Sequence, residues 1–154
     1  MKKSVGIALF FLISCRITQP IPSSVGVVPL DNYFIKNTSQ LIEDVNYIAI
    51  RSPDVFYNTF GVAKTMTNEV RTPNFSGQFV VAVAMKPTNK DVTIRFSKAE
   101  LSGRQMNVYY TVTENPSLLS YKQTPLAVAT IPKGESTKEI VFYFKESKIA
   151  AVSL

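Results

Sequence analysis

The chain has few of the side chains that proteins use for covalent or metal-dependent chemistry. It contains no histidine and a single cysteine, Cys15. A Ser-His-Asp or Cys-His centre therefore cannot form, and the usual ligands of zinc are missing. No serine is followed by a lysine three positions later, and the six glycines form no phosphate-binding motif. The sequence predicts no catalytic residue, no metal site and no cofactor.

Carboxylates are the remaining groups that could transfer protons. The 11 acidic residues occur singly along the chain, except for the neighbours Glu43 and Asp44. Neighbouring residues of a strand point to opposite faces of a sheet, so this pair is not arranged as a general acid and a general base. We therefore expect solvated surface carboxylates and a protein that is not an enzyme.

Cys15 follows a short apolar segment at the start of the chain. Lys2 and Lys3 precede this segment, which spans Val5 to Ile13. It is too short to cross a bilayer core, which takes about 20 residues, and is typical of a secretory signal. Residues 12–15, Leu-Ile-Ser-Cys, resemble the lipobox of bacterial lipoproteins. This resemblance implies that signal peptide 1–14 is removed and that the Cys15 sulfur carries a diacylglyceryl group. Alternatively, Cys15 is only a small residue near an ordinary cleavage site.

The expected lipid and the segment after it predict a membrane-anchored protein. Two acyl chains give stable anchoring, because each buried CH₂ contributes about 0.8 kcal/mol. Residues 15–30 contain three prolines and paired serines, which predicts an extended tether after the lipidated cysteine. We expect the protein in the bacterial cell envelope, at the outer membrane or the cell surface, with the membrane contacted through the lipid.

Charge gives no sign of a nucleic-acid partner. Loss of Lys2 and Lys3 with the signal lowers the formal charge from +6 to about +4. The remaining basic residues are scattered singly and form no cluster that would bind phosphate groups. We therefore expect no binding of nucleic acid.

Residues 31–154 predict a single β-rich domain. Apolar residues alternate with polar ones in several short segments, which is typical of strands with one buried face. The segment Gln78–Met85 is almost entirely apolar and predicts a central strand buried on both faces. The other expected strands are Asp44–Ile50, Val92–Phe96, Arg104–Thr113, Leu126–Ile131, Glu139–Phe144 and Ile149–Leu154. This pattern predicts a mainly β fold, an antiparallel β-sandwich or an open barrel.

One short helix is expected near the N-terminal end of this domain. Ser52 is a good N-cap residue, and Pro53 suits the first helical position. Gly61 stands where such a helix would end. The sequence therefore predicts a helix over Pro53–Phe60, followed by a loop over residues 63–77.

Two connections between the expected strands carry side chains that could bind a partner. The first is residues 86–91, which is either a plain hairpin turn or a recognition loop. Its residues are Lys86, Pro87, Thr88, Asn89, Lys90 and Asp91. The second is residues 114–125, which contains Leu118, Leu119 and Tyr121. These three side chains either fold back over the core or form an exposed interface.

Four short motifs occur between residues 73 and 144. They are Phe75 with Ser76, Lys-Pro-Thr at 86–88, Thr-Pro at 124–125 and Ile-Pro-Lys at 131–133. With these motifs the segment resembles the C-terminal domain of PrcB-type protease-complex subunits. The resemblance implies a non-catalytic exported lipoprotein whose partner is a surface protease. The chain departs from the family in two places. Asn74 replaces an acidic residue, and Asn-Lys-Asp at 89–91 replaces Gly-Gly-Tyr.

These observations lead to one preferred function and two alternatives. We expect a protein that binds another protein, as an accessory or stabilising subunit of a protease complex. The Lys-Pro-Thr sequence at 86–88 is also similar to the Asn-Pro-Thr loop of chagasin-like inhibitors, which implies a protease inhibitor. A surface module that binds glycan or another envelope component is the other alternative, although the chain contains no tryptophan.

The lipid assignment predicts the behaviour of a Cys15→Ala variant. Without the cysteine sulfur no diacylglyceryl group can be attached, so the precursor stays uncleaved and carries no fatty-acid label. Metabolic labelling with a fatty acid, followed by gel analysis, measures this outcome. Labelling that persists in the variant would show that Cys15 is not the lipidated residue.

Overall fold

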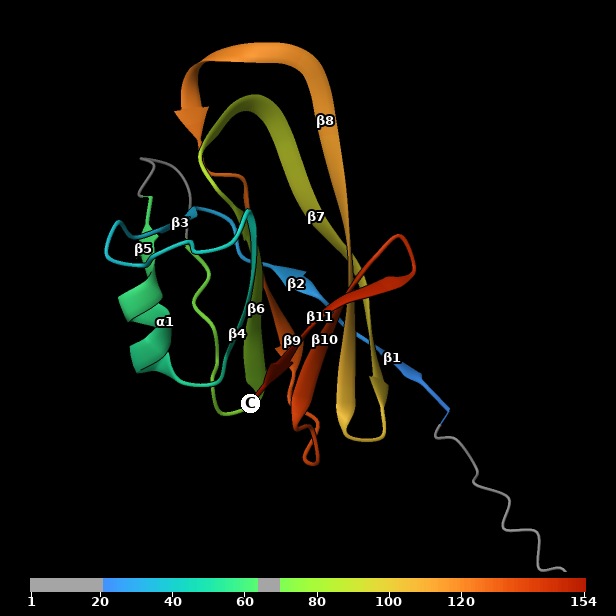
Figure 1. Cartoon of the computed structure of the whole chain (residues 1–154). Helices are drawn as coiled ribbons and strands as arrows, with labels where there is room; N and C mark the ends of the chain where they lie inside the picture. Colours follow the sequence, from blue (N-terminus) through green and yellow to red (C-terminus); the bar gives the residue numbers. More distant parts are fainter. Residues whose placement is uncertain (1–20, 64–69) are drawn as a thin grey trace, which may run out of the picture.

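The computed structural model describes residues 21–63 and 70–154, which form eleven strands and one helix (Figure 1). The signal peptide 1–14 and Cys15 lie outside the described residues. The strands are β1 (Ser23–Val25), β2 (Val28–Pro29), β3 (Tyr33–Ile35), β4 (Val45–Ile50), β5 (Phe60–Val62), β6 (Gln78–Met85), β7 (Thr88–Ser102), β8 (Gln105–Gln123), β9 (Leu126–Pro132), β10 (Glu139–Phe144) and β11 (Ser147–Ser153). The helix is α1 (Pro53–Thr59).

Two sheets pack face to face. The larger sheet has the strand order β1-β7-β8-β10-β11, and the smaller one has the order β2-β9-β6-β4. All pairs in both sheets are antiparallel except β8 with β10, which run parallel. A separate pair, β3 with β5, lies with α1 beside the smaller sheet (Figure 1). The predicted mainly β, antiparallel sandwich with one short helix is confirmed.

The main hydrophobic core fills the space between the two sheets. Val81 and Val83 of β6 face Val108 of β8 and Phe142 of β10, and all four side chains are buried. They alternate with side chains on the opposite face of each strand, because successive residues of a strand point to opposite sides. This period of two is the reason that β10 could be predicted from the sequence, whereas β6 and β9 are buried on both faces.

A second core lies on the other face of β6. Val80 and Ala82 pack there with Ile50 of β4, Phe56 of α1 and Phe60 of β5. The helix and the β3–β5 pair thus cover the face of the smaller sheet that points away from the larger one. The prediction that Gln78–Met85 is buried on both faces is confirmed.

The predicted helix is present, but its cap and its end differ from expectation. The Ser52 side chain makes no capping hydrogen bond, although its carbonyl accepts a bond from the Phe56 amide. Phe60 leaves the helix and begins β5, so Gly61 is a strand residue and not a helix stop. A Cβ atom on Gly61 would lie 2.4 Å from the Phe34 ring. Glycine is therefore suited to this position because the ring of its cross-strand partner covers it.

The expected tether over 15–30 was wrong for its second half. Residues 23–25 pair with β7 and residues 28–29 pair with β9, so this segment joins both sheets. Leu30 is buried in the second core. Prolines and serines suggested an extended, solvated segment, but strands this short are held by distant partners that the local sequence does not show.

Strands β7 and β8 are much longer than the predicted Val92–Phe96 and Arg104–Thr113. In β7 the register against β8 shifts between Phe96 and Lys98, so Ser97 forms a bulge. A bulge reverses which residues face the core. The apolar alternation therefore breaks at this point, and the strand appeared to end at Phe96 although it continues to Ser102.

Loss of a core side chain should lower stability strongly. We expect Phe142→Ala to reduce the free energy of unfolding by about 2–5 kcal/mol, because a fully buried ring leaves a cavity. Ile42→Ala is the control, since Ile42 is exposed and its truncation should change stability by about 0.5 kcal/mol or less. Denaturant unfolding measures both. Equal effects of the two substitutions would contradict the assignment of this core.

Candidate protein-binding site

The ribbon of β7 and β8 bends over one end of the sandwich (Figure 1). It continues the β6–β9 pair of the smaller sheet, because the Met85 amide donates to the Pro125 carbonyl at 2.9 Å and Thr88 then pairs with Gln123. Further along, the same two strands pair inside the larger sheet. We call the bent part the arch, residues 88–91 of β7 and 114–123 of β8.

The two strands of the arch differ in length. From the Asp91–Asn115 pair to the Thr88–Gln123 pair, β7 advances from 91 to 88 while β8 advances from 115 to 123. The outer strand of a bend follows a longer path, and extra residues in one strand bulge away from its partner. Pro116 lies in this irregular stretch, where a missing backbone N–H does not interrupt a regular ladder.

The two segments predicted as separate loops are therefore the two sides of one arch. Residues 88–91 and 114–123 belong to strands, so the prediction of loops at 86–91 and 114–125 was wrong for most of both segments. Lys90 of the first segment pairs directly with Leu118 of the second. Polar side chains and a proline hid both strands, because an arch with little core contact has no apolar alternation.

The apolar side chains of the outer strand are exposed to solvent. Leu118 is 70% exposed and Tyr121 is 62% exposed, while Leu119 is half-buried. Exposed aliphatic and aromatic side chains of this kind are typical of contact surfaces. Leu118 and Tyr121 are three residues apart on the same strand, at the end of the molecule formed by the arch.

Polar contacts hold the arch in its shape. The Lys90 Nζ lies 2.8 Å from the Glu114 Oε1, and the Asn115 side chain donates to the Asp91 carboxylate at 2.7 Å. The Lys90 amide also donates to the Thr88 hydroxyl at 3.1 Å. Such exposed ion pairs each contribute about 1 kcal/mol or less. Together they connect residues of β7 and β8 across the arch.

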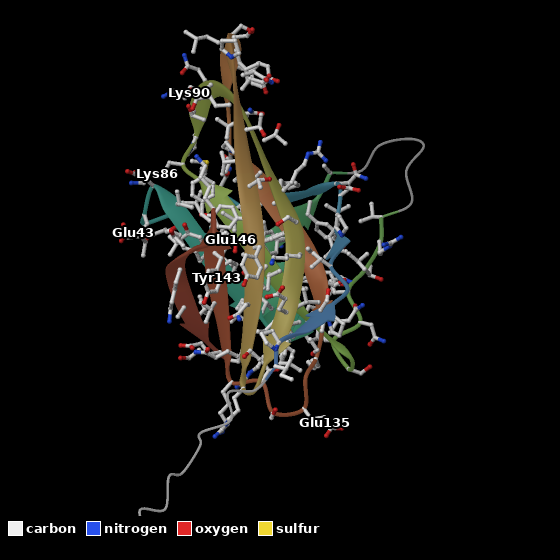
Figure 2. All side chains as sticks on the ribbon, turned by 90° about the vertical axis from the view of Figure 1, so that its right-hand side faces the viewer. Glu43, Lys86, Lys90, Glu135, Tyr143 and Glu146 are labelled. Carbon is white, nitrogen blue, oxygen red and sulfur yellow. The ribbon has the colours of Figure 1, made fainter. Side chains whose placement is uncertain are left out.

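Lys86 and Pro87 form the short connection between β6 and β7 at the foot of the arch. The Lys86 Nζ lies 3.1 Å from the Asp44 carboxylate, and the Lys86 amide donates to the Asp44 carbonyl. Beside this contact lies a groove of about 550 Å³, whose basic side chains are Lys36, Lys86 and Lys122. Figure 2 shows Lys86 below Lys90, on the same side of the molecule as Glu43. The Lys-Pro-Thr sequence is thus docked on the domain and is not a free loop tip.

A second cluster of polar and aromatic residues lies on the larger sheet. The rings of Tyr109 and Tyr143 stack at 4.9 Å, and the Lys98 Nζ lies 4.1 Å from the centre of the Tyr109 ring. Burial, together with a hydrogen bond to Glu100 and the charge of that carboxylate, raises the pKa of Tyr109 to about 12. Since β7 and β10 flank β8, Lys98 and Tyr143 cover opposite faces of the Tyr109 ring.

The described residues contain no group of three or more acidic or cysteine side chains placed to hold a metal ion. Within the same residues, no helix is both long and apolar enough to cross a membrane. Comparison with protein-family models, with curated proteins and with solved structures found no match for this chain. The resemblance to PrcB-type subunits therefore stays a prediction.

Proposed function

We propose that this protein is a lipid-anchored envelope protein that binds another protein through the arch. The observation that supports this most is the exposure of Leu118 and Tyr121 on a strand that Lys90, Asp91 and their partners hold in place. Aromatic and aliphatic side chains usually provide most of the binding energy of an interface. A preformed surface also loses less conformational entropy on binding than a flexible loop does.

The position of the arch in the domain suits this role. The described chain enters through β1, which pairs with residues 99–101 of β7 near the Gly103 turn. The arch lies at the other end of β7, and at about 3.3 Å per residue the two points are roughly 30 Å apart along the strand. The described chain therefore enters the domain at the end of β7 that is opposite to the arch.

Among the three expected functions, the accessory subunit of a protease complex agrees best with this geometry. An inhibitor that inserts Lys86-Pro87-Thr88 into a cleft needs these residues at a protruding tip. They lie instead at the foot of the arch, where Lys86 contacts Asp44. A glycan-binding module usually stacks sugars on open aromatic faces, and in the aromatic cluster of the larger sheet both faces of the Tyr109 ring are covered.

A double substitution in the arch tests this proposal. Leu118→Ser with Tyr121→Ser should weaken binding of the partner protease by more than about tenfold, because two anchors of roughly 2 kcal/mol are lost. The thermal midpoint should stay unchanged, since both side chains are exposed. The measurement is the peptidase activity that copurifies with the tagged mature lipoprotein from solubilised envelopes.

The matched control is Val55→Ser with Tyr57→Ser, which removes one aliphatic and one tyrosine side chain exposed on α1. This variant should recover as much peptidase activity as the unmodified protein. If the purified protein lowers the activity of the recovered peptidase, the result would favour the alternative function of a protease inhibitor. Equal recovery by the arch variant and the control, with both proteins folded, would contradict the proposed binding surface.

A further inference from the structure

An apolar recess of about 300 Å³ opens between the two sheets, next to the arch. Three strands contribute pairs of residues to its wall. These are Val45 and Tyr47 of β4, Val83 and Met85 of β6, and Tyr110 and Val112 of β8. Met85 is the last residue of β6 and Val112 lies just before the arch, so the recess is at the end of the sandwich where the ribbon crosses between the sheets.

The size of the recess separates it from an ordinary packing defect. Protein interiors contain few voids larger than a water molecule, which occupies about 30 Å³ in the liquid. The recess would therefore hold roughly ten water molecules. Below it the same two sheets are closely packed around Val108, Ile131 and Phe142, all of which are fully buried.

The wall of the recess favours an apolar occupant. Among the described residues that line it, none is charged, and the tyrosine hydroxyls are its only side-chain oxygen atoms. The Tyr47 and Tyr110 hydroxyls lie 2.8 Å apart and hydrogen-bond to each other. Burial raises the pKa of Tyr110, so its hydroxyl is neutral at physiological pH. One hydroxyl of this pair donates and the other accepts, which leaves a single O–H group to bond to water at the recess.

Aromatic rings form one continuous side of this wall. The Tyr110 ring stacks on Phe144 at 5.3 Å and lies 6.0 Å from the Tyr47 ring. Ile149 of β11 also lines the recess and is half exposed. The interior is thus apolar and aromatic, while a charged head group would find no counter-charge inside and would stay in solvent.

We propose that this recess binds one acyl chain, with the polar head group of the lipid outside. An acyl chain matches a wall that carries no charge and only two hydroxyl groups, and the length of the acyl chain sets how much of the recess it fills. The acyl chain can belong to a free fatty acid or to a membrane phospholipid. The binding is separate from the protein interface proposed for the arch, because the arch variant at Leu118 and Tyr121 changes no residue that lines the recess.

Photocrosslinking of the mature lipoprotein in nanodiscs tests this inference. One sample receives a free fatty acid with a terminal diazirine, and a second contains a phospholipid with the same group in its acyl chain. Mass spectrometry then locates the adducts. We expect them on the peptides that contain Val83, Met85, Tyr110 and Val112. Adducts in the first sample alone identify a free fatty acid, and adducts in the second identify a chain taken from the bilayer.

Variants that fill the recess provide the decisive comparison. Val112→Phe should lower the adduct yield by about tenfold or more, because the larger ring occupies the space of the ligand. Val62→Phe on β5 is the matched control outside the recess and should leave the yield unchanged. If Val112→Phe does not fold, Ile149→Phe, on the half-exposed side of the recess, gives the same comparison. The proposal would be overturned if the unmodified protein gave no adducts on the peptides that line the recess. It would also be overturned if a folded variant with a filled recess gave the same adduct yield as the control variant.

Discussion

A two-stranded ribbon must pass from one sheet of the sandwich to the other without losing its pairing, and the rest of the structure depends on this. The β6–β9 pair becomes the β7–β8 pair through the arch. Bending makes the outer strand longer, so β8 advances from 115 to 123 while β7 advances only from 91 to 88. Tyr121 is one of the surplus residues without a cross-strand partner, and both Tyr121 and Leu118, which pairs with Lys90, are exposed.

The same crossing creates two surfaces with different chemistry. The arch presents the exposed apolar side chains of Leu118 and Tyr121 and also carries the Lys90–Glu114 ion pair. Next to the arch, Met85 and Val112 border the apolar recess between the sheets. The chain enters the domain near the opposite end of β7, where β1 pairs with residues 99–101. The crossing of the ribbon between the sheets thus produces both the proposed protein-binding surface and the proposed acyl-chain site. The two proposals can be tested independently because they involve different residues.

The sequence predicted the parts of the fold that bury apolar side chains with a regular period. The segment Gln78–Met85 was recognisable because its residues are apolar on both faces, and β10 because alternate residues face the core. The arch was not predictable in this way. Its side chains are mostly polar, its register shifts twice, and Lys90 meets Leu118 only through long-range pairing. The sequence did identify residues 86–91 and 114–125 as binding candidates. It did not show that the two segments form one structural element.

The central claim is that the surplus residues of β8 form a presented surface and are not needed for folding. Deletion of residues 117–120 tests this claim most directly, because it shortens the outer strand of the arch and keeps the alternation of the flanking residues. The account predicts a folded protein with an unchanged thermal midpoint that no longer recovers peptidase activity from envelope extracts. A shortened protein that still recovers the activity, or one that fails to fold, would contradict it.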